Sequence, residues 1–148
     1  VGLTPQSVHA LGGYRVQGRE EAAAARVIEA ALEIQEAGAS LIAISPMLPD
    51  GSLSMTEKNQ LTFDVLSDQG NNVAVEYGIV FRLDDELLKL YDKFGLDVAG
   101  ANGDDSFELP IPATYLVNTD RQISYAFLDV DHTVRMEPAD ILAELRKM

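Results

Sequence analysis

The sequence of 148 residues has no cysteine, no tryptophan and only two histidines, His9 and His132. Without cysteine the chain can form no disulfide, no thiolate metal site and no cysteine-based intermediate. This absence does not identify a compartment, for which the cytoplasm is the default expectation. No apolar run approaches the length of a membrane-spanning helix, and no charged-then-apolar leader is present. We therefore expect no membrane partner.

Positive charge is also scarce. The chain has 11 Lys and Arg against 24 Asp and Glu, which gives a net charge of −13. Nucleic-acid binding requires clustered Lys and Arg, and anionic lipid would repel this surface, so neither partner is expected. The apolar share of 47% and the charged share of 24% are ordinary for a globular protein. The length suits a single domain, residues 1–148, with a buried core.

Helical periodicity is strongest between Arg19 and Ala37. Val27, Ile28, Ala31 and Ile34 recur at helical spacing on one face, with glutamates on another. Gly38 should end this helix, because glycine adopts the left-handed conformation without strain. Ile28 is the residue that we expect to anchor the helix in the core. Further helices are expected at 54–57, 71–78, 84–95 and 137–148, the first of them opened by a capping box after a turn at 49–52.

Short apolar runs between these helices predict strands at 40–45, 64–68, 115–117 and 123–127. The segment 118–122 reads as a hairpin connection, and 97–110 as an acidic loop. Strands that alternate with helices, followed by one late hairpin, indicate an α/β fold with a sheet of mixed direction. There is no internal repeat.

Three stretches carry a resemblance to a known family: "GASLIAISPMLPDGSLSMTEKNQLTFDVLSDQGNNVAVEYGIVF", "NGDDSFELPIPATYLVNTD" and "DVDHTVRMEPADIL". From about Gly38 to Met148 the chain resembles peroxiredoxin-like proteins of the alkyl hydroperoxide reductase/thiol-specific antioxidant family. The resemblance implies a thioredoxin-like mixed sheet sandwiched by helices. In this family a reactive cysteine pair lies between the first core strand and the first helix.

The first 37 residues resemble a different family. "GLTPQSVHALGGYRVQGR" is similar to a segment of ketopantoate hydroxymethyltransferase, a (βα)₈-barrel enzyme, where the segment leads into the fourth helix. We expect the seam near "IQEAGAS", because both families have a helix that ends in a Gly-Ala pair before a strand. The fold would then be a thioredoxin-like domain with a grafted, barrel-derived loop and helix at its N-terminus.

Together the two resemblances imply that neither set of catalytic residues is present. The barrel-derived segment stands where the peroxiredoxin-like family has its cysteines. The barrel family's His lies just before the Gly-Leu-Thr-Pro-Gln stretch, and its catalytic Glu and metal-binding acids lie on other barrel strands. We therefore expect no catalytic, metal or cofactor site, and we interpret the chain as a chimera. Engineering is the favoured origin, and natural recombination stays open as the alternative. The alternative is a redox-inactive thioredoxin-fold module that binds a partner through a groove beside Pro112.

The resemblance also predicts the geometry of one proline. Thioredoxin folds have a cis-proline before the third core strand, facing the thiol site, and "IPATYLV" matches that position. We therefore predict a cis Ile111–Pro112 bond, although few X–Pro bonds are cis in general. The strand that should precede the first helix has no clear source. Val1–Leu3, Tyr14–Val16 or a second chain through strand exchange could supply it, so a monomer and a strand-exchanged homodimer are both open.

Other motifs favour structural interpretations. Residues 13–20, "GYRVQGRE", nearly match a phosphate-binding loop, but Glu20 replaces the metal-binding hydroxyl. Residues 102–106, "NGDDS", lack the spacing of a calcium loop and read as a solvated loop. His132 lies beside Asp129 and Asp131, yet no third ligand or nucleophile has suitable spacing. His9 is expected to cap or pack within its loop.

Overall fold

The computed structural model describes residues 21–131 and 134–148, and the side chains from residue 28 onward. The expectations for residues 1–20, including His9 and the loop at 13–20, lie outside these residues, as does His132. The chain divides into two compact units, one formed by Val1–Leu41 with Pro112–Met148 and the other by Ile42–Ile111. Neither boundary coincides with the predicted seam near residue 37. The single domain over 1–148 stays a prediction.

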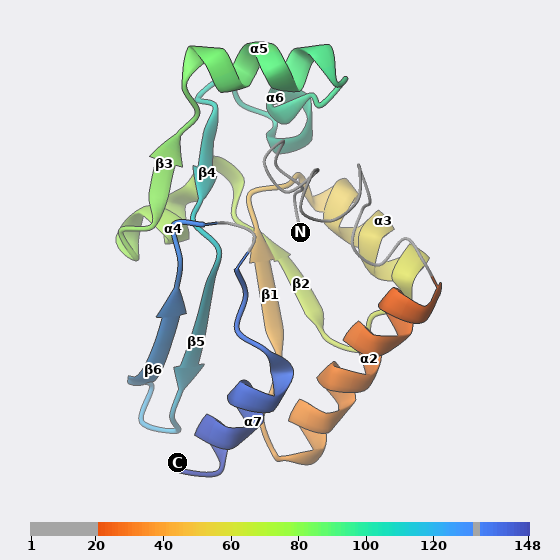
Figure 1. Ribbon diagram of the computed structural model, residues 1–148, viewed down its shortest axis with the longest axis vertical. Coiled ribbons are helices and arrows are strands. Elements are labelled where there is room, and N and C mark those ends of the chain that lie inside the picture. The colour runs from red at the N-terminus through yellow and green to blue at the C-terminus, as the bar shows by residue number, and fades with distance from the viewer. Residues whose placement is uncertain (1–20, 132–133) are drawn as a thin grey trace. The chain divides into compact units, whose positions relative to one another are not determined.

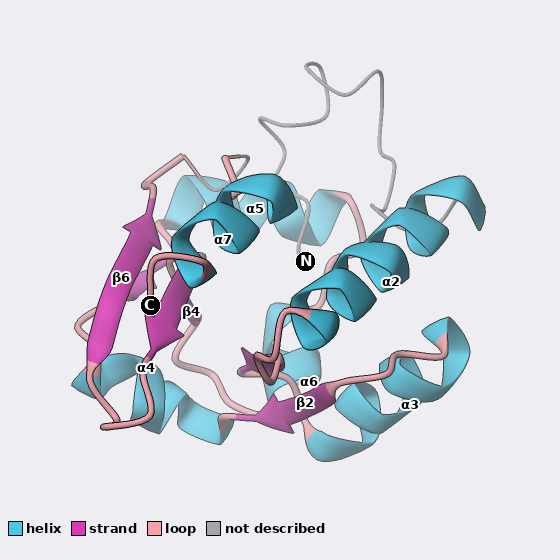
Figure 2. Cartoon of the chain, turned by 90° about the horizontal axis from the view of Figure 1, so that it is seen from below, coloured by secondary structure: helices cyan, strands magenta, loops and turns pink. Residues whose placement is uncertain are grey.

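In the described residues of the first unit there are two helices and a β-hairpin. Helix α2 (Glu21–Glu36) lies beside helix α7 (Pro138–Leu145), and the two helices make direct contact (Figures 1 and 2). Strands β5 (Ala113–Val117) and β6 (Ile123–Leu128) pair antiparallel from Ala113 opposite Leu128, with an irregularity between Leu116 and Val117. The turn is closed by Asn118, whose backbone N–H donates to Gln122 O and whose Oδ1 accepts from Gln122 N. The predicted hairpin is confirmed.

Helix α2 buries one stripe of small and branched apolar residues. Ala31 is 2% exposed and Ile34 is 5% exposed, whereas Ile28 is only half-buried. The helix ends at Glu36, and Gly38 follows with φ of 88°. The N–H of Gly38 donates to Gln35 O, and that of Ala39 to Ile34 O, which satisfies carbonyls of the last turn. The predicted helix and its glycine stop are confirmed.

The second unit contains four short strands and five helical segments. Its elements are β1 (Ile42–Ser45), α3 (Pro49–Asn59), β2 (Asp64–Ser67), the 3₁₀ turn η1 (Gln69–Asn71), α4 (Asn72–Glu76), β3 (Val80–Arg82), α5 (Asp85–Lys93), α6 (Val98–Asn102) and β4 (Glu108–Pro110). β1 pairs with β2 in parallel, and β3 pairs with β4 antiparallel. Parallel and antiparallel pairs therefore both occur, but in separate sheets, so the predicted single sheet of mixed direction is not found among the described strands. The strands of the described chain form three two-stranded sheets.

Three local expectations for this unit are wrong. Residues 49–52, predicted as a turn, form the start of α3, because Pro49 suits the first helical position and Asp50 suits the positive end of the helix. The predicted capping box at 54–57 lies within that helix. The predicted loop at 97–110 contains α6 and β4. There the Asp97 carboxylate accepts from Gly100 N at 2.8 Å and starts the short helix.

The predicted cis Ile111–Pro112 bond is also wrong, since no peptide bond of the described residues is cis. The reason lies in the strand before it. Ile111 N donates to Ile79 O at 2.7 Å, which continues the β3–β4 pairing one residue beyond Pro110. Strand β5 then begins at Ala113. The trans Ile111–Pro112 bond thus lies between the end of one strand pairing and the start of the next strand.

Candidate functional site

Two of the four buried polar residues of the second unit, Asp68 and Asn71, lie just after β2. Asp68 is 8% exposed and follows the last residue of the strand. Its two carboxylate oxygens accept hydrogen bonds from Val73 N at 3.0 Å and from Ala74 N at 2.9 Å. Its own N–H donates to Ser45 O at 2.7 Å. Both oxygens are thus engaged by the start of α4, and Asp68 acts as a structural cap rather than a free base.

Asn71 lies three residues later and is 1% exposed. It has φ of 55°, a conformation that asparagine tolerates better than most residues. Its Nδ2 donates to Glu108 O at 3.1 Å, which ties η1 to β4, while its Oδ1 is buried without a hydrogen-bond partner. The amide therefore serves to hold two segments together.

Two serines of this unit face one another. Ser52 is buried in α3, and its Oγ lies 2.8 Å from the Oγ of Ser67 at the end of β2. A serine nucleophile requires a base that accepts its proton, usually a histidine. Here the two serine hydroxyls are hydrogen-bonded to each other instead. The pair joins a helix to a strand and offers no activated nucleophile.

The acidic segments form local turns. Asp104 Oδ1 accepts from the backbone N–H of Ser106 at 2.9 Å and from its hydroxyl, and these hydrogen bonds hold the pKa of Asp104 below its ordinary value. Asp129 Oδ1 accepts from Asp131 N at 2.8 Å. Among the described residues, no group of three or more His, Cys, Asp or Glu side chains could hold a metal ion.

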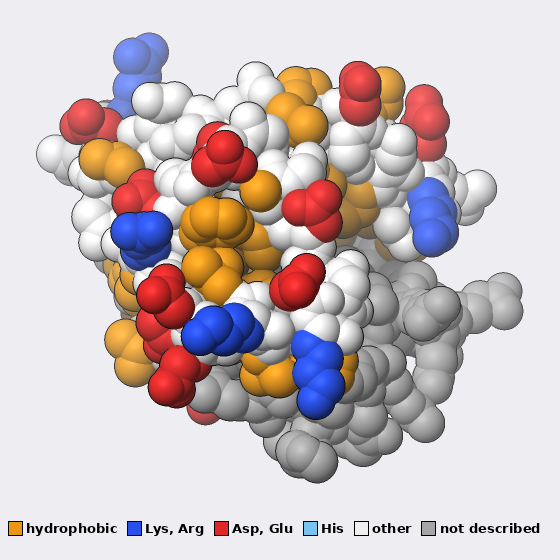
Figure 3. Space-filling view, turned by 90° about the horizontal axis from the view of Figure 1, so that it is seen from above, with side chains coloured by type: hydrophobic (Ala, Val, Ile, Leu, Met, Phe, Trp, Pro, Cys, Tyr) orange, Lys and Arg blue, Asp and Glu red, His pale blue; other side chains and the backbone are white. Residues whose placement is uncertain are grey.

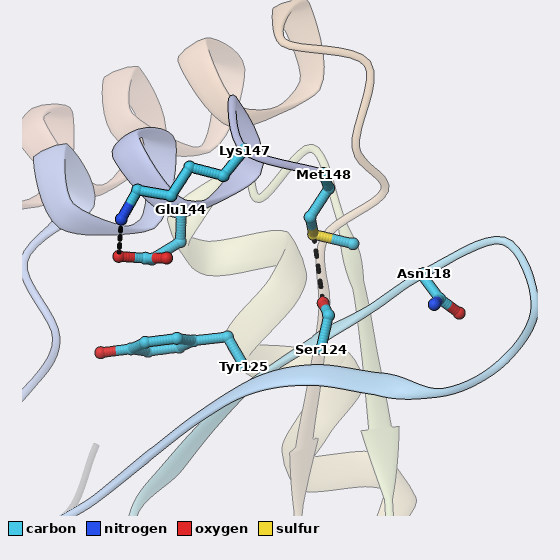
Figure 4. A pocket seen from close by; sticks show the side chains of 6 residues that line it. All are labelled: Asn118, Ser124, Tyr125, Glu144, Lys147 and Met148. Atoms are coloured by element: carbon cyan, nitrogen blue, oxygen red, sulfur yellow. Dashed lines mark hydrogen bonds and ion pairs between the residues drawn. The ribbon is translucent and has the colours of Figure 1, made fainter.

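A shallow hollow in the first unit lies between β6 and the end of α7 (Figure 4). Its volume is about 250 Å³. No motif in the sequence predicted a binding site at these residues. Glu144 and Lys147 form an ion pair of 2.6 Å on one wall, and Ser124 Oγ donates to Met148 Sδ at 3.3 Å on another. The lining residues are Asn118, Ser124, Tyr125, Glu144, Lys147 and Met148.

Charges of both signs are mixed on the surface that Figure 3 shows, where carboxylates and cations surround exposed apolar side chains. On α5 the acidic Asp85 and Glu86 lie in the first turn and Lys93 lies in the last, so each charge is opposite in sign to the partial charge at its end of the helix.

No helix in the described part of the chain is long and apolar enough to cross a membrane.

Comparison with known proteins identifies two kinds of similarity. Residues 1–61 match the family model of ketopantoate hydroxymethyltransferase. The 3-methyl-2-oxobutanoate hydroxymethyltransferase of Aromatoleum aromaticum is 40% identical over 96 residues, which cover 65% of this chain and 32% of that enzyme. The same enzymes of Magnetococcus marinus and Yersinia pestis are 36% and 35% identical, with the same coverage. The chain thus spans about a third of the length of these relatives.

One solved structure similar to this chain is the crystal structure of a mutant of peroxiredoxin 6 from Arenicola marina. The TM-score is 0.55 at 18% identity, and the match covers 83% of this chain and 51% of the peroxiredoxin. At this identity the similarity concerns the fold alone. It confirms the predicted thioredoxin-like α/β fold.

The family-model match ends at residue 61, and the matches to the individual enzymes run over 96 residues, so the sequence similarity does not end near residue 37. It therefore includes β1 and α3, beyond the helix–Gly–strand segment in which the seam was predicted. Both predicted resemblances are nevertheless supported. The chain has a chimeric composition: it combines a segment similar in sequence to ketopantoate hydroxymethyltransferases with a fold similar to that of a peroxiredoxin.

Proposed function

We propose that this chain catalyses neither peroxide reduction nor hydroxymethyl transfer. The observation that carries the proposal is the absence of cysteine from all 148 residues. Peroxide reduction in the peroxiredoxin-like family proceeds through a cysteine sulfenic acid, and a thiol then restores the cysteine. The four methionines can each be oxidised once, but reduction of their sulfoxides requires a dedicated enzyme.

The described polar side chains support the same proposal. Asp68 is engaged by two backbone N–H groups, and Ser52 and Ser67 are paired with each other. The 250 Å³ hollow is smaller than most small-molecule sites, which measure roughly 300–1,000 Å³. Its Ser124, Lys147 and Met148 are exposed. Nothing in these clusters supplies a nucleophile with a base, or a desolvated charge, in a closed site.

The chimeric composition further leads us to propose that the chain was engineered, as a test of whether fragments of two α/β folds are compatible. The support is that the two similarities concern unrelated architectures within one short chain. A single natural reading frame that runs through both segments would show natural recombination instead.

A second candidate is a redox-inactive module that binds a partner. The hollow between β6 and α7 is the observation that favours it, because Tyr125 offers an aromatic face beside the Glu144–Lys147 pair. Its small volume and exposed lining make this candidate weaker than the first. A Tyr125→Ala substitution that leaves folding intact but abolishes capture of a partner would favour the module.

The first proposal is tested with the 148-residue chain in two assays, metal-free for peroxide reduction and with an added divalent metal ion for hydroxymethyl transfer. One follows peroxide consumption with excess dithiol, and the other follows hydroxymethyl transfer to 3-methyl-2-oxobutanoate. We expect no turnover in either assay and, with peroxide, at most stoichiometric methionine oxidation. Sustained turnover that scales with protein concentration and is lost on heat unfolding would overturn the proposal.

A further inference from the structure

Asn102 and Gly103 form the only Asn-Gly pair in the sequence. In such a pair the backbone nitrogen of the glycine can attack the side-chain carbonyl carbon of the asparagine, because no β-carbon obstructs the approach. The reaction requires an accessible side chain, a free glycine N–H and a backbone that can rotate between the two residues. The fold of the second unit removes all three conditions.

The first two conditions fail at the end of α6. Asn102 is the last residue of this helix and is 7% exposed. The N–H of Gly103 donates to Ala99 O at 2.7 Å, so the attacking nitrogen is held in the helix cap. Gly103 has φ of 73°, the left-handed conformation in which glycine commonly ends a helix.

Leu48 fixes this helix end from a distant part of the sequence. Its N–H donates to Ala101 O at 3.0 Å, one residue before Asn102. Its side chain lies so close to Gly103 that a β-carbon there would meet Leu48 Cδ2 at 2.7 Å. The backbone between Asn102 and Gly103 therefore cannot rotate into the geometry of attack unless Leu48 withdraws and the last turn of α6 opens.

We propose that Asn102–Gly103 is a deamidation site that the fold keeps latent and that reacts when α6 opens. In the reaction Gly103 N loses its proton and bonds to Asn102 Cγ. The bond from Cγ to the side-chain nitrogen breaks, and ammonia leaves. Water then opens the resulting five-membered imide at one of its two carbonyl carbons, which gives aspartate or isoaspartate. Only water is consumed, and no group is oxidised or reduced.

The modification is one-way. It places a new carboxylate at a position that is 7% exposed, in a chain whose net charge is already −13. The isoaspartate product also lengthens the backbone by one carbon, so the hydrogen bond from Gly103 N to Ala99 O cannot form in its present geometry. Each opening that leads to reaction is thereby recorded in the covalent structure.

The test compares the full-length chain in mildly alkaline buffer with and without a denaturing concentration of guanidinium. Peptide mass spectrometry follows aspartate and isoaspartate at residue 102, with Asn118, which precedes Thr119, as the internal reference. We expect residue 102 to react at least about tenfold faster in denaturant than in buffer, as exchange from a protected state predicts. In denaturant it should also react faster than Asn118, and Gly103→Ala should abolish that advantage.

Two leucine substitutions, one at the N-cap of α3 and one within α3, test the protection itself. Leu48→Ala should raise the rate in buffer several-fold toward the rate in denaturant, because the helix end loses its cover. Leu53→Ala, on the same helix at a position 59% exposed, should leave the rate unchanged. Equal rates for the native and denatured chain, or equal rates for these two variants, would overturn the proposal. If Leu48→Ala fails to fold by circular dichroism, the comparison of native and denatured parent chain decides.

Discussion

At the scale of single residues, Asp68 has the largest set of backbone hydrogen bonds that a described carboxylate makes in the second unit. Its two carboxylate oxygens accept hydrogen bonds from Val73 N and Ala74 N, and its own N–H donates to Ser45 O. One residue, through its side chain and its own N–H, therefore links the end of β2, the start of α4 and the end of β1. Sequence patterns show such an aspartate only as a polar residue between a strand and a helix.

We predict that Asp68→Ala lowers the free energy of unfolding by about 1–3 kcal/mol, because two buried N–H groups lose their acceptors. Urea unfolding followed by circular dichroism measures this loss. Asp105→Ala, at an exposed loop position, is the matched control and should change the free energy by less than about 0.5 kcal/mol. Equal effects of the two substitutions would show that Asp68 does not act as a cap.

At the scale of elements, helix α2 tests whether the barrel-like segment is part of a packed core. Ile34 is 5% exposed on the stripe that packs in the first unit, and Ile28 is half-buried. We predict that Ile34→Ala lowers the free energy of unfolding by about 2–5 kcal/mol, as expected for truncation of a buried isoleucine. Ile28→Ala should lower the free energy of unfolding by less than Ile34→Ala does, because Ile28 is less buried.

The control for α2 is Leu32→Ala, since Leu32 is 44% exposed on the same helix. Its effect should be about 0.5 kcal/mol or less. Chemical unfolding of Ile34→Ala, Ile28→Ala and Leu32→Ala measures the loss in free energy of unfolding for each and so ranks the three. If Ile34→Ala unfolds with the parent chain, α2 is not docked, and the first 41 residues contribute little to the first unit.

The elements also show how far sequence patterns reach. Helices α2, α5 and α7 were predicted from different signals: apolar periodicity and Gly38 for α2, an acidic first turn and Gly95 for α5, and a first-turn proline with Lys147 near the end for α7. Strand β3, of three residues, and the five-residue α6 are too short to show a period. The start of α3 was missed because "PDGS" fits both a turn and a helix N-terminus, and only packing decides between them.

The candidate site was less predictable than the fold. The resemblance to two families indicated which catalytic residues to look for, and no pattern indicated the hollow beside Tyr125, whose lining comes from separate segments of the first unit. The cis geometry at Pro112 was inferred from the family's active site. In this chain the N–H of Ile111 is bound to Ile79 O, and the local pairing sets the path of the backbone.

At the scale of the whole molecule, the net charge of −13 is the dominant feature. Carboxylates in such excess repel one another more in the compact state than in the unfolded chain. We predict that the melting temperature rises when sodium chloride is added from low ionic strength, because the salt screens this repulsion. An uncharged osmolyte at equal osmolality separates screening from solvent exclusion. A melting temperature that falls with moderate salt would mean that attractive ion pairs outweigh the repulsion.

The end of α2 has a consequence for how such a chain can arise. A β-carbon added at Gly38 would meet no atom within 4 Å, and the hydrogen bonds that close the helix there are all local. A helix end of this kind, here called a glycine joint, needs no contact with residues that are distant in the sequence. Any helix that ends in the same way could be spliced in before the next strand, whichever ancestor it came from. Recombination at glycine joints would let unrelated proteins exchange whole helices, and each helix would keep its local conformation.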